Sequence, residues 1–313
     1  MLCVSSAMKR RRFEGIAQMS TQYQKVTDRI IAMLEKGTRP WVQPWAGAVG
    51  GGRPLRHDGT PYRGANTLNL WAAAMERGFA SRTWMTYKKA QELGGQVKKG
   101  AKSEHAFFVG AITRTEERNG EETERTIPFL KAYNVFNTEE IEGLPAQYYP
   151  VAVAVTVLDE HERNAKVDLF LAMTGAKIVE GGSRAFYHRV SDQIHMPTFG
   201  SFDSASAYYG TAFHEVAHWT GAEKRLDRTK GKVFGDPDYA FEELVAELTA
   251  AYLSADLAIT TEPREDHASY IASWLKALRD DNRNIFRAAS YAEKAAAYLH
   301  GMQCVEQMAE AAD

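Results

Sequence analysis

A His-Glu-x-x-His sequence within residues 208–221 constrains the fold of this chain more than any other feature. Polar residues that can cap a helix precede the stretch, Gly221 can end it in a left-handed turn, and no proline interrupts it, so we expect one helix. Residues four apart lie on one helical face with their Cβ atoms about 5–6 Å apart. His214 and His218 can therefore direct two imidazoles at one metal ion.

Glu215 follows the first histidine and is rotated from it by about 100° around the helix. In that direction its carboxylate lies beside a bound ion, where it can accept the proton of a metal-bound water. A helix that carries two histidines by coincidence is the alternative. We predict a zinc site with Glu215 as general base, in which manganese or another divalent ion can replace zinc in vitro.

Catalytic zinc takes three protein ligands and leaves one position open for water. The pattern with a third histidine, His-Glu-x-x-His-x-x-Gly-x-x-His, is excluded because Lys224 stands at its last position and an ammonium cannot bind zinc. Residues 241–253 instead predict a buried helix, because apolar residues occupy most directions around it. Glu243 and Glu247 lie on one face of that helix, where two carboxylates repel unless a cation is near.

We assign Glu243 as the third zinc ligand and Glu247 as the acceptor for the ring N–H of a ligand histidine. The neighbouring Glu242 is expected to point elsewhere. The alternative is a solvated acidic edge that binds no metal.

Charge is distributed unevenly along the 313 residues, although the formal net charge is −2. Between Lys9 and Ser103, 18 Lys and Arg stand against 6 Asp and Glu, a net of +12. Residues 146–313 carry 16 against 25, a net of −9. The first half is therefore expected to bind an anionic partner.

The two cysteines, Cys3 and Cys304, form no metal or disulfide pattern, which is typical of free thiols in a reducing cytoplasm. No apolar run approaches the ~20 residues of a membrane span. At the N-terminus the apolar residues precede the basic run 9–12, the reverse of a signal peptide. We expect a soluble cytoplasmic protein with no membrane partner.

The order of the expected elements predicts an α+β fold with two domains. Residues 1–19 show no periodicity and are expected to be a disordered extension. A small α+β domain is expected over residues 20–145, and a mostly helical domain with a small sheet over residues 146–313.

Within the first domain, helical patterns over 22–36 and around 68–75 precede two apolar strands. The strands are expected over 106–112 and 126–136, and an Asn119-Gly120 turn joins them as a hairpin.

Aromatic residues alternate with Lys and Arg in this first domain. Single-stranded nucleic acid binds to such surfaces because its bases stack on rings while cations contact its phosphates. A small domain must also bury its tryptophans, and we expect Trp41 and Trp71 to pack inside. The candidate DNA contacts are Tyr62, Arg63, Trp84, Tyr87, Lys88, Lys98, Lys99 and Lys102.

Several motifs in one order resemble the ArdC-type antirestriction proteins of conjugative plasmids, over nearly all of residues 20–300. The first half is similar to the single-stranded-DNA-binding domain of that family through Pro40-Trp41, Tyr62-Arg63-Gly64-Ala65-Asn66, Trp84-Met85-Thr86-Tyr87, Gly94-Gly95-Gln96-Val97-Lys98-Lys99-Gly100 and Val135-Phe136-Asn137. The second half is similar to its zincin-like, gluzincin-like metallopeptidase domain through Asp192-Gln193-Ile194-His195-Met196-Pro197, Tyr208-Tyr209, residues 214–221 and residues 242–247.

The resemblance implies binding of single-stranded DNA without sequence preference and protection of incoming plasmid DNA from host restriction. It also implies a zinc metallopeptidase domain with an unidentified protein substrate, whose turnover protection need not require. Two alternatives stay open. One is an intracellular zinc endopeptidase whose basic domain recruits a protein substrate, and the other is a zinc domain that serves as a non-hydrolytic scaffold.

Overall fold

The structure is a computed structural model that describes residues 21, 23–42, 52–118, 121–149, 162–228, 237–259 and 268–304. The chain forms two compact units. Segments 55–60 and 81–149 belong to the first unit, and segments 23–54, 61–80 and 150–313 belong to the second. The predicted extension over 1–19 and the Asn119-Gly120 turn lie outside the described residues.

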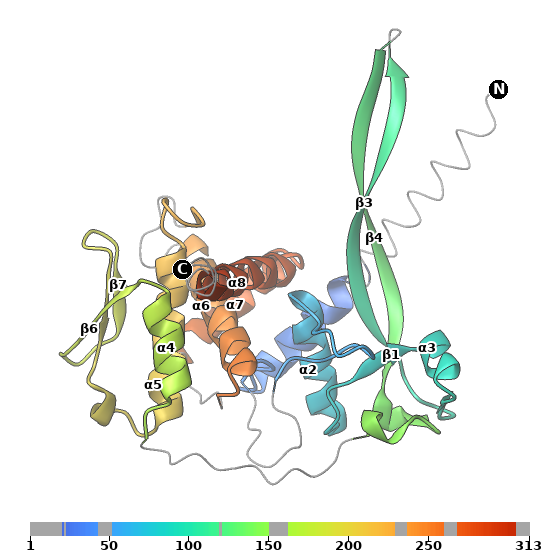
Figure 1. Cartoon of the computed structure of the whole chain (residues 1–313), viewed down its shortest axis with the longest axis horizontal. Coiled ribbons are helices and arrows are strands. Elements are labelled where there is room, and N and C mark those ends of the chain that lie inside the picture. Colours follow the sequence, from blue (N-terminus) through green and yellow to red (C-terminus); the bar gives the residue numbers. More distant parts are fainter. Residues whose placement is uncertain are drawn as a thin grey trace, which may run out of the picture. The chain divides into compact units, whose positions relative to one another are not determined.

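A sheet with the strand order β1-β4-β3 forms the first unit (Figure 1). β3 (Glu104–Arg118) pairs antiparallel with β4 (Glu121–Asn137) over the whole length of β3, from Glu104 opposite Val135 to Arg118 opposite Glu121. β1 (Trp84–Thr86) pairs with the last three residues of β4. The two long strands therefore continue past β1 as a ribbon and exceed the predicted strands over 106–112 and 126–136.

A small core closes the base of this sheet. It consists of Met85, Ala90, Ile141 and Leu144. The elements that supply or flank it are α3 (Tyr87–Glu92), β2 (Gln96–Val97), η1 (Thr138–Glu140), β5 (Ile141–Glu142) and η2 (Ala146–Tyr148).

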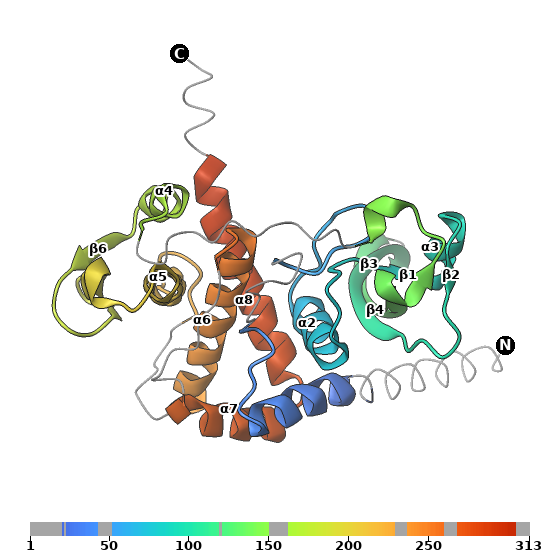
Figure 2. The same cartoon turned by 90° about the horizontal axis from the view of Figure 1, so that it is seen from below.

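Helices dominate the second unit, whose large apolar core is built around α5 and α6. In Figure 2, α5 is seen nearly end-on beside α6, and α8 runs along α6. The helices are an N-terminal one over residues 23–35, α2 (Ala65–Arg77), α4 (Ala165–Met173), α5 (Ala205–Thr220), α6 (Pro237–Asp256), α7 (Ala268–Asp280) and α8 (Asn284–Gly301). None of the described helices is long and apolar enough to cross a membrane.

A small sheet accompanies these helices, with the strand order β6-β8-β7. The central strand β8 pairs parallel with β6 and antiparallel with β7. The bounds are β6 (Lys177–Glu180), β7 (Phe186–His188) and β8 (Gln193–Met196), followed by η3 (Phe199–Ser201), while η5 (Met302–Cys304) ends the described chain. The predicted α+β class, with a mostly helical second half and a small sheet, is confirmed.

The N-terminal helix packs within the second unit, although the sequence suggested it for the first domain. Its Ile30 and Leu34 are buried in the core of that unit, and the Thr27 hydroxyl donates to the carbonyl of Asn282 at 2.7 Å. Trp41 and Trp71 are buried there too, as expected of tryptophans. Chain order cannot reveal this grouping, because an apolar helix face can complete either core. The boundary at residues 145 and 146 stays a prediction.

A buried arginine fixes the segment before α2 to two helices of the second unit. The Arg53 guanidinium donates twice to Asp256 of α6, at 2.7 and 2.8 Å, and once to Glu293 of α8, at 2.6 Å. It also lies 4.5 Å from the centre of the Tyr252 ring. The Glu293 carboxylate accepts the backbone N–H of Gly64 at 2.9 Å.

We expect Arg53→Met to destabilise the second unit by about 2–3 kcal/mol, because it removes the buried cation that two carboxylates share; the figure is discounted for the partial exposure of these carboxylates to water. Urea unfolding followed by circular dichroism measures this change. Arg283→Met, at a guanidinium that is mostly exposed beside Asp281, is the control and should change stability little. Equal effects of the two substitutions would contradict the assigned role of Arg53.

Candidate metal centre

Helices α5 and α6 place five ionisable side chains around one buried point. Ser204 caps the start of α5, because its hydroxyl accepts the N–H of Ala207 at 3.0 Å. The helix carries His214, Glu215 and His218. α6 carries Glu243 and Glu247. His214, Glu215, Glu243 and Glu247 are all buried, and His218 is partly buried. Both helices also contribute apolar residues to the core of the unit, so the site is built on packed helices and not on loops.

The ligand atoms of His214, His218 and Glu243 lie within 4.8 Å of one another. The two Nε2 atoms are 3.1 Å apart, and each is 3.4 Å from an oxygen of Glu243. Zinc bonds of about 2.0–2.2 Å arranged as a tetrahedron give ligand–ligand separations of about 3.3–3.6 Å. The residues therefore fit a small divalent ion held by two imidazoles and one carboxylate.

Each ligand histidine turns its other ring nitrogen toward a second carboxylate. His214 Nδ1 lies 3.8 Å from Glu247, and His218 Nδ1 lies 3.8 Å from Glu242. Such carboxylate–histidine pairs orient a metal-binding ring and raise its basicity, although these two separations are longer than hydrogen bonds. The carboxylate beside His214 is the one expected from the sequence.

The expectation that Glu242 points elsewhere is wrong. Its carboxylate is buried and accepts from Arg228 Nη2 at 3.0 Å. Arg228 also donates to the carbonyl of Ala217 at 2.7 Å, so it satisfies the end of α5 as well. Gly221 itself stays right-handed, with φ of −75°, so the predicted left-handed turn at this residue is wrong. A buried carboxylate needs a partner, and that rule applied to Glu242 would have signalled its role.

Electrostatics in the site favour a proton where the ion would bind. Burial lowers the pKa of His218, but the charge of Glu243 and the neighbouring carboxylate of Glu242 outweigh this effect and raise the pKa to about 10. Burial raises the pKa of Glu243, and the two histidines outweigh it, so the pKa of Glu243 lies below its ordinary value. The metal-free site therefore holds a protonated His218 beside ionised carboxylates.

Glu215 supplies the one buried carboxylate of α5 next to the ligand triad, and its charge is among those that raise the pKa of His218. A bound divalent ion would polarise a carbonyl and acidify a water molecule. Glu215 is placed to accept a proton beside the ligands. Together these groups can perform metal-assisted hydrolysis.

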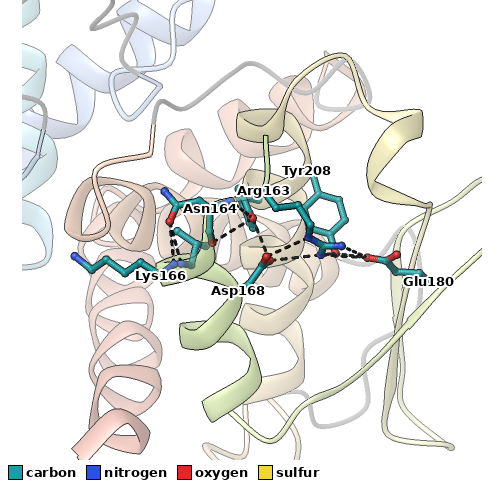
Figure 3. Close-up of polar contacts among 8 residues, drawn as sticks. Arg163, Asn164, Lys166, Asp168, Glu180 and Tyr208 are labelled. Atoms are coloured by element: carbon teal, nitrogen blue, oxygen red, sulfur yellow. Dashed lines mark hydrogen bonds and ion pairs between the residues drawn. The ribbon is translucent and has the colours of Figure 1, made fainter. Parts of the chain in front are cut away.

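The start of α5 is held by a polar cluster that Figure 3 shows around Arg163. The Arg163 guanidinium contacts Asp168 of α4 at 3.1 Å and Glu180 of β6 at 3.4 Å. Glu180 also accepts the hydroxyl of Tyr208 at 2.8 Å. Burial, followed by this hydrogen bond, raises the pKa of Tyr208. The cluster joins α4, β6 and α5 about one and a half turns before His214.

The end of α5 is held by a second cluster. Arg225 lies over the ring of Trp219, 3.9 Å from its centre, and pairs with Asp192 in the turn between β7 and β8. Lys224, at the position of the excluded third histidine, also pairs with Asp192 at 2.8 Å. Both ends of the metal-binding helix are thus fixed to the small sheet.

The structure divides the predicted DNA contacts by exposure. Tyr62 and Trp84 are 6% and 1% exposed, so neither ring has a face open to a base, and the prediction that they stack on DNA is wrong. Aromatic residues near basic ones also occur where the rings simply fill a core, as Trp84 does at the start of β1. The exposed members are Arg63, Tyr87, Lys88, Lys98, Lys99 and Lys102.

Sequence reasoning missed exposed rings on the long ribbon. Phe108 and Tyr133 are 46% and 44% exposed. They lie on one face of the ribbon with Lys131, because directly paired residues share a face and Lys131 pairs with Phe108. The alternation of side chains along a hairpin would have placed these residues together.

Part of the positive charge of the first half is already neutralised inside the second unit. Arg39 pairs with Glu247 and Arg53 with Asp256, and both carboxylates lie outside the stretch that was counted. The net of +12 therefore overstates the charge that is free to bind DNA.

Comparison with known proteins agrees with this geometry. Residues 165–291 match the family of zincin-like metallopeptidases, and residues 20–136 match the N-terminal domain of the anti-restriction factor ArdC.

The chain is similar over its length to the antirestriction ArdC protein from the R388 plasmid. The metal-free crystal structure of that protein is 45% identical and has a TM-score of 0.77, with 90% of this chain and 97% of the other covered. An Mn(II)-bound structure of it is 43% identical, with a TM-score of 0.75 and the same coverage. The zincin-like region, the ligand triad and this neighbour together indicate a divalent-metal protein.

Two relatives known from sequence are similar as well. The uncharacterized protein y4eC of Sinorhizobium fredii is 39% identical over 92% of this chain and 94% of its own length. The DNA primase TraC of Escherichia coli is 39% identical over 87% of this chain, which spans 26% of TraC.

We expect the purified protein to bind about one divalent ion, and His218→Ala to abolish that binding because two ligands hold an open site too weakly. Metal content after dialysis, measured by mass spectrometry, tests this. His188→Ala removes an exposed histidine of β7 and should bind normally. Full metal content in folded His218→Ala would contradict the assigned ligands.

Metal binding should strengthen as pH rises. Between pH 6 and 8, below the His218 pKa of about 10, each ion must displace one proton, so the affinity should rise about tenfold per pH unit. Calorimetry in buffers of different ionisation enthalpy measures the released proton. Glu242→Gln removes a carboxylate that raises this pKa and should reduce the release. Equal affinity at pH 6 and 8 would refute the linkage.

Proposed function

Because the chain belongs to the ArdC family of antirestriction proteins, we propose that it binds single-stranded DNA without sequence preference and protects incoming plasmid DNA from host restriction. Its second unit then holds zinc in a metallopeptidase site. The 45% identity to an antirestriction protein over 90% of this chain supports the proposal of DNA binding and protection. The triad of His214, His218 and Glu243 supports the proposal of a zinc metallopeptidase site.

Exposed cations and rings of the first unit support DNA binding. Tyr87 is 43% exposed at the start of α3, beside the exposed Lys88. Lys98, Lys99 and Lys102 are exposed in the loop that leads into β3. Bases can stack on the open ring while phosphates contact the ammonium groups. Phe108, Tyr133 and Lys131 offer a second set of the same chemistry on the ribbon.

Zinc is the ion we propose, because two imidazoles and one carboxylate are the ligands of many catalytic zinc sites. Mn(II) can occupy the same ligands, as it is bound in a related ArdC structure.

An intracellular endopeptidase is the second candidate, and the buried Glu215 beside the ligands favours it. In that function the first unit would recruit a protein substrate instead of DNA. The two candidates differ in whether Glu215 is needed for protection.

We expect single strands to bind more tightly than duplex, because unstacked bases can reach Tyr87. Affinity should fall with salt, with a logarithmic slope of roughly −0.7 per phosphate neutralised. Tyr87→Ala should weaken binding by about 1–3 kcal/mol, whereas Tyr291→Ala, a 36% exposed ring of the second unit, should not. Fluorescence anisotropy with labelled oligonucleotides measures both. Tighter binding of duplex would overturn the proposal.

Glu215→Ala should retain the metal, slow any peptide hydrolysis by about 10²–10⁴, and leave DNA binding and protection intact. Protection by coating needs no bond to be broken. Lys98→Glu with Lys99→Glu should instead impair both, while Lys166→Glu with Lys177→Glu, at exposed lysines of the second unit, makes the same charge change as a control. Plasmid transfer into a restricting recipient is the assay. If metal-loaded Glu215→Ala fails to protect, the endopeptidase becomes the function.

A further inference from the structure

Two side chains that follow the N-terminal helix reach the metal centre. Arg39 Nη1 donates to Glu247 Oε1 at 3.2 Å, and Trp41 Nε1 donates to the same oxygen at 3.3 Å. They come from the sequence region that matches the N-terminal ArdC domain, whereas Glu247 belongs to the zincin-like region. The two matched regions thus meet at one carboxylate of the second unit.

All three side chains in this contact are removed from water. The side chains of Arg39 and Glu247 are 8% and 7% exposed, and Trp41 is 1% exposed. A carboxylate so deeply buried requires a positive or donating partner. Arg39 supplies the charge and Trp41 supplies a neutral donor.

The opposite oxygen of Glu247 faces the ligand His214. Oε1 receives the two donors, and Oε2 lies 3.8 Å from His214 Nδ1. Anchoring one oxygen fixes the rotation of the carboxylate and therefore the direction of the other. The carboxylate can then orient the imidazole, whose Nε2 faces the ion site.

We propose that Arg39 and Trp41 are positioning residues of the metal centre. Both act through Glu247 on the ligand His214. The zincin-like region alone then lacks part of the support of its own metal site. The inference rests on the proposed metal function. It adds that residues before the predicted DNA contacts set the affinity of the ion.

The packing around Trp41 supports a fixed donor. Its ring meets that of Trp274 of α7 edge-to-face, with centres 6.0 Å apart, and the Trp274 ring stacks on Tyr270 with centres 6.2 Å apart. A ring held on its apolar side keeps its N–H aimed at Glu247. Helix α7 therefore contributes indirectly to the site.

The test measures the affinity of the full chain for Zn²⁺ alone, by competition with a chromophoric chelator. Removing a partner that orients a ligand costs about 10–100-fold in metal affinity. We expect that loss for Arg39→Gln and a smaller one for Trp41→Phe, which keeps an aromatic ring and removes the donor. Arg39→Lys should recover part of the affinity because it restores the charge.

Arg53→Gln is the matched control. Arg53 is equally buried and pairs with Asp256 on the same helix, α6, away from the ligands. The Arg53→Gln substitution should lower the unfolding temperature without changing the zinc affinity of the folded protein. The absorption spectrum of bound Co²⁺ gives a second measurement, since it reports ligand geometry. It should change in Arg39→Gln and Trp41→Phe and stay as in the wild type in Arg53→Gln.

A double-substitution cycle identifies the path. In the Glu247→Gln background, Arg39→Gln should cause little further loss, because both act on one histidine. Wild-type affinity and spectrum in folded Arg39→Gln and Trp41→Phe would overturn the inference while leaving the metal site intact. Absence of zinc binding by the wild type would overturn both.

Discussion

Helix α6 buries three carboxylates, Glu242, Glu243 and Glu247, and much of the second unit is arranged to compensate them. Arg228 pairs with Glu242 and Arg39 with Glu247, while the two histidines of α5 face Glu243. Each compensating group comes from a different segment of the chain. A divalent ion would complete the balance at Glu243, where the histidines provide neutral ligands. Three segments of the chain are thus joined to α6 by charge neutralisation. They are the N-terminal segment, α5 and the residues directly after α5.

Sequence was informative where spacing along one helix determines geometry. The four-residue interval in α5 predicted two imidazoles on one face, and the structure places their Nε2 atoms 3.1 Å apart. The absence of a third histidine directed attention to a second acidic helix, and Glu243 lies where that argument placed it. The class of the fold followed from the order of helices and short strands.

Contacts between segments that are far apart in the sequence could not be predicted from local spacing. Arg39 and Arg53 contributed to a basic region that suggested DNA binding, yet they neutralise carboxylates more than 200 residues away. Charge counted along a chain does not distinguish a solvated cation from a buried one. Nor does the sequence around Trp84 show whether its ring is buried or exposed. The ring is buried because of the place of Trp84 in β1. Tertiary packing supplied what local pattern could not.

The contact between Arg39 and Glu247 joins residues 208 positions apart, and this separation has a consequence for synthesis. At about 5–20 residues per second, a ribosome needs roughly 10–40 s to make the chain between them. Segment 81–149 is completed within that interval and can fold first, because its core consists of its own residues. During that time Ile30, Leu34 and Trp41 lack the core residues that α5 to α8 supply. Apolar surface exposed in this way on a nascent chain is prone to aggregate, which chaperones prevent.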